Sequence, residues 1–446
     1  MRRATKPLVL AAALAWLAGC ASTPTQTAPG AVAEAPVPAA FGEAQALARA
    51  DASANAGRIE ALLAGLDDAA LSRHTHALAA SDPLYPFAAR AMLRRGLKPP
   101  HAFNHGWNFE GRAPADRDGY RPPRKVALLL PLSGALSTAA KPVRDGFLAG
   151  YHAETRARPS VTFYDSAGGA GVAYQRAVAD GADYVVGPLD RDQVGSLFAQ
   201  GELPVPVLAL NRGSKAPPPG SVSFSLSPED EGIAAAEYAI AQGARDVLLL
   251  IGGDDSLRRT AVAFRERLQA RGGRVIDSIA LGTGAEALAA QLAGIAGKGK
   301  VDAIYFAARG DQARAAMPAI LAQPALASAR RLAASQIAGT PGKAQQLGLL
   351  DGIVFPGESV GARALPGMPG NPAALTPTAA GPAARLFAFG YDAWLITAYL
   401  ERLAQASQPG LPGATGTLQL DGFGNILRAP SWSVLRGGVA TPLGAR

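Results

Sequence analysis

The chain has one cysteine, Cys20, in 446 residues. Without a second cysteine it cannot form an intramolecular disulfide, so its stability must come from packed hydrophobic cores. A chain of this length is long enough to bury two or three such cores and to form two or three domains.

The chain also has little excess charge. Residues 1–19 carry three basic and no acidic side chains, and the remaining 427 residues contain 40 basic and 35 acidic ones. This surplus is too small for a nucleic-acid-binding protein, which needs clustered lysine and arginine. The basic stretch 112–125 is interrupted by Asp116 and Asp118, so we interpret it as a solvated connector.

Motifs for catalysis and cofactor binding are missing. The loop that holds Ser133 lacks the Gly-x-Ser-x-Gly pattern of a nucleophile elbow. The glycines of 168–171 lack the spacing of a dinucleotide-binding loop, and 297–300 lacks that of a P-loop. We therefore expect no enzyme activity and no cofactor.

Histidine is scarce. After residue 124 the only histidine is His152, so a serine nucleophile has few candidate bases. His74 and His76 are two residues apart in an expected helix and point to different sides. We therefore predict no metal site and interpret these histidines as solvated.

The N-terminus has the features of a lipoprotein signal peptide. Arg2, Arg3 and Lys6 precede the apolar run 7–17, whose eleven residues are too few to span a bilayer. Leu17-Ala18-Gly19-Cys20 is a lipobox, which predicts cleavage after residue 19 and acylation of Cys20. The alternative is an ordinary signal peptide followed by a chance cysteine.

The lipobox also predicts the location of the protein. Two or three acyl chains hold a protein on a membrane more firmly than one chain can. Ala21 follows the cysteine, whereas aspartate there is the usual signal for retention in the inner membrane. We therefore expect the outer membrane, with the protein facing the periplasm.

Two segments of different composition follow. Residues 20–40 consist largely of Ala, Pro and Thr, which cannot build a core and indicate an extended tether. Residues 41–123 are expected to form a short helical region and a connector. Apolar residues recur at helical spacing up to Lys98, which predicts three or four short helices, and Pro99-Pro100 ends them.

From residue 124 to 446 the pattern is strand, loop and helix in alternation. This rhythm predicts an α/β domain with parallel sheets covered by helices on both faces. The expected strands are 126–130, 161–164, 184–186, 207–210, 247–251, 275–279, 304–307 and 352–355.

The same segment can form one eight-stranded sheet or two lobes, and its length favours two. The first lobe is expected at about 124–243 plus about 383–410, with a crossing near Gly243. The second is expected at about 244–360 plus the C-terminal strands. The Gly- and Pro-rich stretch 361–382 suits a long surface connection.

Several segments, taken in order, resemble a known family. They are Val126–Gly134, Val143–Phe147, Val186–Leu189, Val207–Asn211, Phe224–Gly232, Val301–Phe306, Phe389–Ala393 and Gly413–Asp421. They are similar to the type I periplasmic-binding-protein fold and, within it, to the LppC/LpoA family of outer-membrane lipoproteins that activate penicillin-binding proteins. The resemblance covers about residues 124–440.

The resemblance implies a two-lobed fold and a role in peptidoglycan synthesis. The implied partner is a bifunctional penicillin-binding protein, whose peptide cross-linking the family stimulates. The better-known members have a long helical-repeat domain before this fold, whereas about 60 helical residues precede it here. What that longer domain does is therefore not implied for this chain.

The alternative is a periplasmic receptor that binds an amino-acid-like solute between its lobes. In such a receptor, polar groups at the strand ends would line the cleft. The candidates in this sequence are Ser133, Asp165, Asn211, Ser335 and Asp392. Amino-acid-binding relatives of the fold place small hydroxyl residues after the third and fourth strands, where this chain has Gly187-Pro188-Leu189 and Asn211-Arg212. The sequence therefore gives little support for a small-molecule ligand.

Overall fold

The structure is a computed structural model, and it describes residues 36–282, 284–297, 299–338, 348–357, 374, 376–405 and 410–443. Cys20, the signal peptide and most of the tether lie outside these residues, as does most of the stretch 361–382. Residues Pro38–Arg446 form one compact unit.

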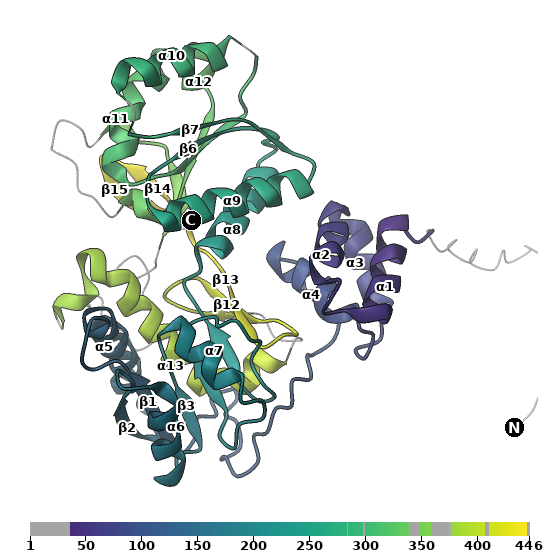
Figure 1. The fold of residues 1–446 in the computed structure, drawn as a ribbon, viewed down its shortest axis with the longest axis vertical. Coiled ribbons are helices and arrows are strands. Elements are labelled where there is room, and N and C mark those ends of the chain that lie inside the picture. The colour runs from purple at the N-terminus through teal and green to yellow at the C-terminus, as the bar shows by residue number, and fades with distance from the viewer. Residues whose placement is uncertain are drawn as a thin grey trace, which may run out of the picture. The chain divides into compact units, whose positions relative to one another are not determined.

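Four short helices begin this unit, which we call the helical bundle (Figure 1). They are α1 (Ala39–Asp51), α2 (Ala56–Gly65), α3 (Asp68–His76) and α4 (Tyr85–Arg94). The side chain of Asp67 accepts a hydrogen bond from the backbone N–H of Ala70 and caps α3. Pro86 occupies the first turn of α4, where its missing N–H costs nothing.

One face of α1 is buried, and it consists of Phe41, Ala44 and Ala48. Phe41 is the largest apolar side chain of this helix, and its ring lies 5.4 Å from that of His74 in α3. Burial of Phe41 sets the orientation of the helix, so the residues three and seven positions further on, Ala44 and Ala48, are buried with it.

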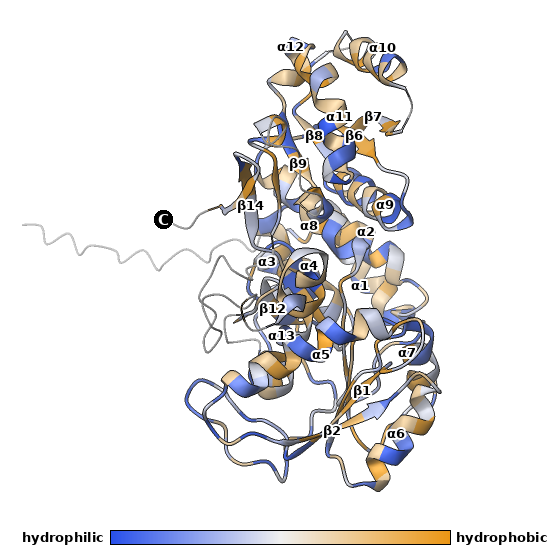
Figure 2. Cartoon of the chain, turned by 90° about the vertical axis from the view of Figure 1, so that its left-hand side faces the viewer, coloured by the Kyte–Doolittle hydropathy of each residue, from blue (hydrophilic) through white to orange (hydrophobic). Residues whose placement is uncertain are grey.

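The first lobe is built on an eight-stranded sheet. Its strands, in spatial order, are β11 (Leu411–Pro412), β12 (Thr417–Leu420), β13 (Asn425–Ala429), β5 (Val222–Phe224), β4 (Val207–Ala209), β3 (Tyr184–Val186), β1 (Lys125–Leu130) and β2 (Ser160–Asp165). Its helices are α5 (Ser137–Ala153), α6 (Ala170–Ala179), α7 (Arg191–Phe198) and α13 (Ala384–Ala404). Strands β1 to β5 pair in parallel. In Figure 2, β1 carries the hydrophobic colour expected of a strand that is buried on both faces.

The second lobe is built on a seven-stranded sheet. Its strands, in spatial order, are β15 (Val439–Pro442), β14 (Trp432–Arg436), β10 (Val354–Pro356), β9 (Arg330–Ala333), β8 (Ala303–Ala307), β6 (Asp246–Ile251) and β7 (Arg274–Ala280). Its helices are α8 (Pro228–Ala241), α9 (Asp255–Ala270), α10 (Ala285–Ala296), α11 (Gly310–Leu321) and α12 (Pro324–Ala327), followed by the 3-10 helix η1 (Ser335–Ala338). Two lobes with separate sheets agree with the expected fold class.

The lobe boundaries differ from those drawn on the sequence. Helix α8 precedes Gly243, yet its Ala235 and Ala239 pack with Val247 and Phe264 in a core of the second lobe. The chain therefore crosses between the lobes at 225–227, because α8 buries its apolar face against the sheet that follows it.

The C-terminal strands are also divided between the two lobes. Strand β13 pairs in parallel with β5 of the first sheet, whereas β14 pairs with β10 of the second. The expectation placed all of the C-terminal strands in the second lobe. A short strand can extend whichever sheet edge it reaches, and its sequence does not record which edge that is.

The two longest helices of the first lobe cross at a pair of glycines. A Cβ atom at Gly146 of α5 would lie 1.9 Å from the carbonyl oxygen of Phe387, and one at Gly390 of α13 would lie 1.9 Å from that of Val143. Only glycine permits this backbone approach. The sequence segments 143–147 and 389–393, which resemble the known family, thus meet in space.

Candidate functional site

The cleft between the lobes contains a pocket of about 560 Å³. The first lobe contributes the strand ends around Asn211 and Ser225 together with residues of α13, and the second lobe contributes the start of α8 and Arg259 of α9. Carboxyl ends of parallel strands converge here, as at ligand sites of α/β proteins. This is the cleft that the receptor alternative requires.

The structure scatters the five residues expected to line this cleft. Ser133 and Asp165 lie together, because the hydroxyl of Ser133 donates a hydrogen bond of 2.7 Å to the Asp165 carboxylate. Both side chains are exposed, and neither lines the pocket. Asn211 lines it, and its amide donates to the carbonyl of Leu189 at 3.0 Å.

Asp392 is fully buried in α13, so it does not lie on a cleft wall. Its carboxylate accepts hydrogen bonds from the backbone N–H groups of Ala414 and Thr415, at 2.5 and 2.8 Å, and from the Thr415 hydroxyl at 2.6 Å. Burial raises the pKa of Asp392 to about 6, and these hydrogen bonds oppose the rise. Asp392 therefore anchors the loop before β12.

Ser335 belongs to a polar cluster that spans the lobes. Its backbone N–H and hydroxyl donate to Glu231 of α8, at 2.6 and 3.0 Å. Arg385 of α13 donates to the Ser335 hydroxyl at 2.7 Å and to the Glu231 carboxylate at 2.8 Å. We call this cluster the Arg385 link.

The electrostatics of the Arg385 link favour its charged form. Burial raises the pKa of Glu231, but attraction by Arg385 and the hydrogen bonds from Ser335 outweigh burial and lower it overall. Glu231 is therefore ionised at neutral pH. Arg385 sits in the first turn of a helix, where the helix dipole disfavours a cation, so the carboxylate compensates for its position.

The neighbouring acidic residues of α8 each meet a different arginine. Asp230 lies 2.7 Å from Arg212, which follows β4 of the first lobe and forms a second link between the lobes. Glu229 accepts a hydrogen bond of 2.6 Å from Arg259 within the second lobe. Burial raises the pKa of Glu229, but Arg259 and Ser227 outweigh burial and bring the pKa to about 2.

Sequence reasoning missed these arginines. The available signal was the run of three acids at 229–231, which follows the Ser227 cap and Pro228 of α8. Acids are favourable in a first helical turn without any partner, so the run alone did not indicate a contact between lobes. Arg385 is 154 residues from Glu231 in the chain.

The chemistry available in the cleft is electrostatic. Its lining residues include neither histidine nor cysteine, and the arginines Arg212 and Arg259 are paired with carboxylates of the protein. Within the described residues, no three potential metal ligands lie together. In these same parts of the chain, no helix is both long enough and apolar enough to cross a membrane.

Comparison with protein families gives a match that spans residues 120–438, to the family described as "LppC putative lipoprotein". The chain belongs to the LppC family. The match covers both lobes but not the helical bundle, so the fold and the family assignment rest on the same part of the chain.

Curated relatives carry the name penicillin-binding protein activator LpoA. The chain is 26% identical to the one from Photobacterium profundum over 348 residues, which cover 71% of this chain and 56% of that protein. It is 32% identical to the one from Vibrio antiquarius over 154 residues, which cover 32% of this chain and 25% of that protein. The chain thus spans little more than half, or less, of these relatives.

Solved structures agree on the fold. Full-length LpoA from Haemophilus influenzae matches with a TM-score of 0.61 at 20% identity, over 90% of this chain and 71% of that one. A structure from Chromobacterium violaceum, titled a putative branched-chain amino acid ABC transporter, matches with a TM-score of 0.56 at 28% identity, over 70% of this chain and 99% of that one. The LppC domain thus has the fold of periplasmic binding proteins.

Proposed function

We propose that this LppC-family protein is an outer-membrane lipoprotein that binds and activates a bifunctional penicillin-binding protein, and that it catalyses no reaction itself. The observation that carries the proposal is the family match over both lobes, with relatives that are named penicillin-binding protein activators. Activation requires only that the protein bind the active form of its partner better than the inactive form. A preference of about 1 to 3 kcal/mol gives a five- to hundredfold effect.

The geometry of the cleft favours this role over solute binding. A receptor of this fold closes its lobes around a ligand through a hinge. In this chain two ion pairs already join the lobes: Arg385 pairs with Glu231, and Arg212 pairs with Asp230. Arg212 also lines the cleft pocket, so a solute that paired with it would have to displace Asp230, and each displaced charge-assisted hydrogen bond costs about 1.5–3 kcal/mol.

Calorimetry separates the two functions. We expect no heat of binding with the common amino acids, because Arg212 and Arg259 of the cleft are paired with carboxylates of the protein. A micromolar dissociation constant for any amino acid, lost in Arg212→Ala, would support the receptor instead.

The anchor is proposed to be the lipid on Cys20, which places the protein on the periplasmic face of the outer membrane. Cys20→Ala is expected to abolish incorporation of labelled fatty acid and to release a folded protein from the membrane. The matched control is Ser22→Ala, which alters the same segment and leaves the lipobox cysteine in place. Fatty-acid labelling of the Cys20→Ala variant would contradict this anchor.

Co-purification from detergent-solubilised envelope tests the proposed partner. We expect a peptidoglycan synthase to be recovered with the tagged full-length chain. Recovery of a permease in its place would favour the receptor, because solute receptors deliver their ligands to permeases.

A further inference from the structure

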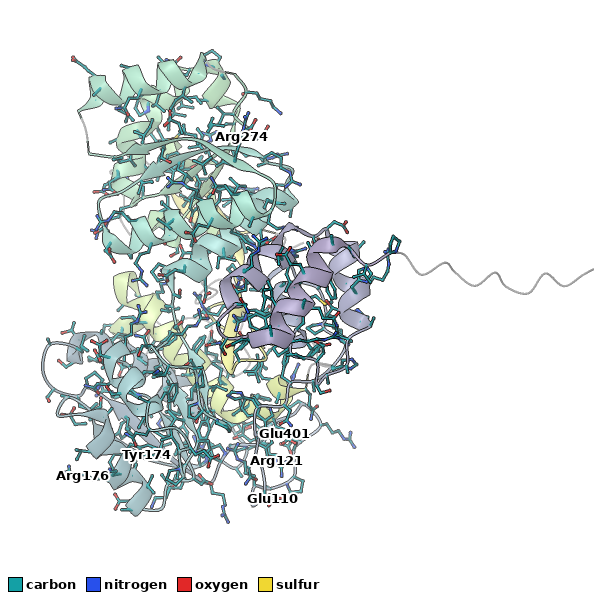
Figure 3. All side chains as sticks on the ribbon, turned by 45° about the vertical axis from the view of Figure 1, so that its right-hand side comes forward. Glu110, Arg121, Tyr174, Arg176, Arg274 and Glu401 are labelled. Atoms are coloured by element: carbon teal, nitrogen blue, oxygen red, sulfur yellow. The ribbon has the colours of Figure 1, made fainter. Side chains whose placement is uncertain are left out.

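A pocket of about 780 Å³ lies where the helical bundle meets both lobes, and we call it the seam pocket. The bundle contributes the end of α2, the start of α3 and the end of α4. The second lobe contributes α8, Arg271 and Trp432, and the first lobe contributes β12 and β13. In Figure 3 the purple bundle lies beside the helices of the second lobe. The pocket is separate from the cleft around Asn211.

Arginines hold the bundle at this seam. Arg271, which follows α9, donates to the carbonyl of Leu66 at 2.9 Å and to the Asp68 carboxylate at 3.1 Å. Arg95, which follows α4, donates to the same two residues at 2.8 and 3.0 Å. These bonds satisfy carbonyls at the end of α2, which have no partner within the helix.

Positive charge exceeds negative charge here. Arg267 and Arg271 both pair with Glu237, while Arg95 and Arg271 share Asp68. Arg94, which lines the pocket, has its nearest carboxylate, Glu60, 3.7 Å away. Three guanidinium groups, those of Arg95, Arg267 and Arg271, thus share two carboxylates at the centre of the seam.

Burial and the crowding of positive charges together lower the pKa of two of these arginines. Burial lowers the pKa of Arg267 to about 10, and although Glu237 opposes this, the charges of Arg94 and Arg95 add to it. Burial and the charge of Arg271 likewise lower the pKa of Arg95, whose Nε is buried without a hydrogen-bond partner in the described structure. An added anion would relieve this repulsion.

Part of the remaining wall is apolar. Ile233 and Tyr238 of α8, Leu427 of β13 and Trp432 of β14 line it. The rings of Tyr238 and Trp432 lie 4.1 Å apart at an angle of 32° and form a shelf. An aromatic pair beside arginines suits a ligand with both an apolar group and acidic groups.

We propose that the seam pocket binds an acidic peptide segment that carries a large apolar side chain. The arginines would pair with its carboxylates, and the Tyr238–Trp432 shelf would take its apolar side chain. Four carboxylates also line the pocket, and each is held by a group of the protein: Asp67 by the N–H of Ala70, and Asp68, Asp230 and Glu237 by arginines. A lipid tail would need a continuous apolar wall, which these polar groups interrupt. At this volume the pocket has the size of a ligand site.

Substitutions of Arg94 and Arg245 test the proposed peptide site. Both line the pocket, and neither holds the bundle as Arg95 and Arg271 do. Arg245 donates to the carbonyl of Arg271 at 3.0 Å and has an exposed side chain. The double variant Arg94→Glu/Arg245→Glu reverses the charge of the pocket while retaining the seam contacts.

Fluorine NMR of the full-length chain labelled with fluorotryptophan gives the readout. The chain has four tryptophans, and of the three that the structure describes Trp432 lines the seam pocket. The variant Trp432→Phe assigns its resonance. The probe is the peptide acetyl-Gly-Glu-Asp-Leu-Phe-Glu-Gly-amide. It is titrated to about 5 mM, so that a dissociation constant in the millimolar range can be measured. We expect a saturable shift of the Trp432 resonance alone, and at least tenfold weaker binding to the double variant.

Two controls test whether binding depends on the charge of the pocket and on the charge of the peptide. Arg176→Glu reverses a charge on α6, away from the pocket (Figure 3), and should leave binding unchanged. The basic peptide acetyl-Gly-Lys-Arg-Leu-Phe-Lys-Gly-amide should not bind. If the double variant fails to fold, Ala241→Glu at the exposed rim replaces it and should also weaken binding at least tenfold.

Three outcomes would overturn the proposal. They are an unmoved Trp432 resonance, an equal shift with the basic peptide, and an equal shift with free glutamate, which would indicate a simple anion site. The probe is synthetic and no synthase is present, so the test succeeds or fails independently of the proposed function.

Discussion

Arg385 and Glu231 join the two lobes through a hydrogen bond of 2.8 Å between the first turns of α13 and α8. Both side chains belong to helices that the cleft separates, and Ser335 bonds to each of them. In a solute receptor the ligand makes such contacts between the lobes. Here the protein's own side chains make them.

Removal of Arg385 should destabilise the protein. Arg385→Ala leaves Glu231, a buried carboxylate, without its cation, and breaking a buried pair costs about 3 kcal/mol. The control Arg309→Ala breaks an exposed pair with Asp254 and should cost less than about 1 kcal/mol. Urea unfolding measures both changes, and equal costs would contradict the role of the Arg385 link.

A double-mutant cycle isolates the pair. If Arg385 and Glu231 act together, Arg385→Ala/Glu231→Ala should cost less than the sum of the single variants, by about 1–3 kcal/mol. Additive costs would mean that each residue acts separately. Spin labels on α5 and α10 should report a broader distance distribution in Arg385→Ala.

The glycines at the crossing of α5 and α13 should not tolerate a side chain. Gly146→Ala and Gly390→Ala each place a methyl group against a backbone carbonyl. Each should lower the free energy of unfolding by about 1–3 kcal/mol or more. Gly294→Ala in α10 meets nothing within 4 Å and should stabilise by about 0.5–1 kcal/mol. Thermal unfolding distinguishes the signs, and tolerance at Gly146 would contradict the close crossing.

Asp392 should make stability depend on pH. Its pKa is raised to about 6 in the folded protein, so the folded state binds a proton more tightly than the unfolded state. The resulting stabilisation is present below the unfolded pKa and is lost as pH rises through about 6. The shift corresponds to about 3 kcal/mol.

The comparison with Asp392→Asn isolates this effect. The difference in unfolding free energy between wild type and variant should change by up to that amount between about pH 4 and pH 7, in favour of wild type at the lower pH. Urea unfolding across this range measures the difference. A constant difference would show that Asp392 does not titrate there.

The helical bundle should depend on Arg90. Its Nε donates at 2.9 Å to Asp421, whose side chain is 1% exposed, and its guanidinium lies over the ring of Phe423. Arg90→Ala should therefore cost about 3 kcal/mol and accelerate hydrogen exchange in α1 to α4. Arg58→Ala, which breaks an exposed pair with Glu43, should do neither. Unchanged exchange in Arg90→Ala would mean that other contacts dock the bundle.

The connector after the bundle is fixed in the same manner. Arg121 donates to Glu401 of α13 at 2.7 Å, and the two side chains are labelled side by side in Figure 3. The sequence suggested a solvated connector here because its charges alternate. Partners from α13, far along the chain, were not visible in that pattern.

The sequence predicted the elements whose signal is local. The eight expected strands, such as 126–130 and 184–186, coincide with β1, β3 and six other strands. Central strands such as β1 and β3 carry the apolar run of a buried parallel strand, whereas the edge strands β2 and β7 are partly exposed and also contain polar residues. Strand β9 begins with Arg330 and Arg331, and β5 has Ser223 at its centre, so neither has that signal. The count of short N-terminal helices was likewise within the expected three or four.

The candidate site was less predictable, because its residues are defined by contacts between distant segments. Asn211 was found from its place at a strand end, and Ser335 was named without its partners. Arg212 and Arg385 carry no local pattern that separates them from surface arginines. The segments 143–147, 389–393 and 413–421, which identified the family, meet at the helix crossing and at Asp392, so much of the family resemblance is architectural.

The most direct test of the proposed function adds the purified full-length chain to a purified bifunctional penicillin-binding protein with lipid-linked precursor, and counts cross-linked peptides. We predict a severalfold increase in cross-linking, no reaction with precursor when the synthase is omitted, and no change when heat-denatured chain is added. Unchanged cross-linking with every bifunctional synthase of the source bacterium, together with no detectable binding, would contradict the account.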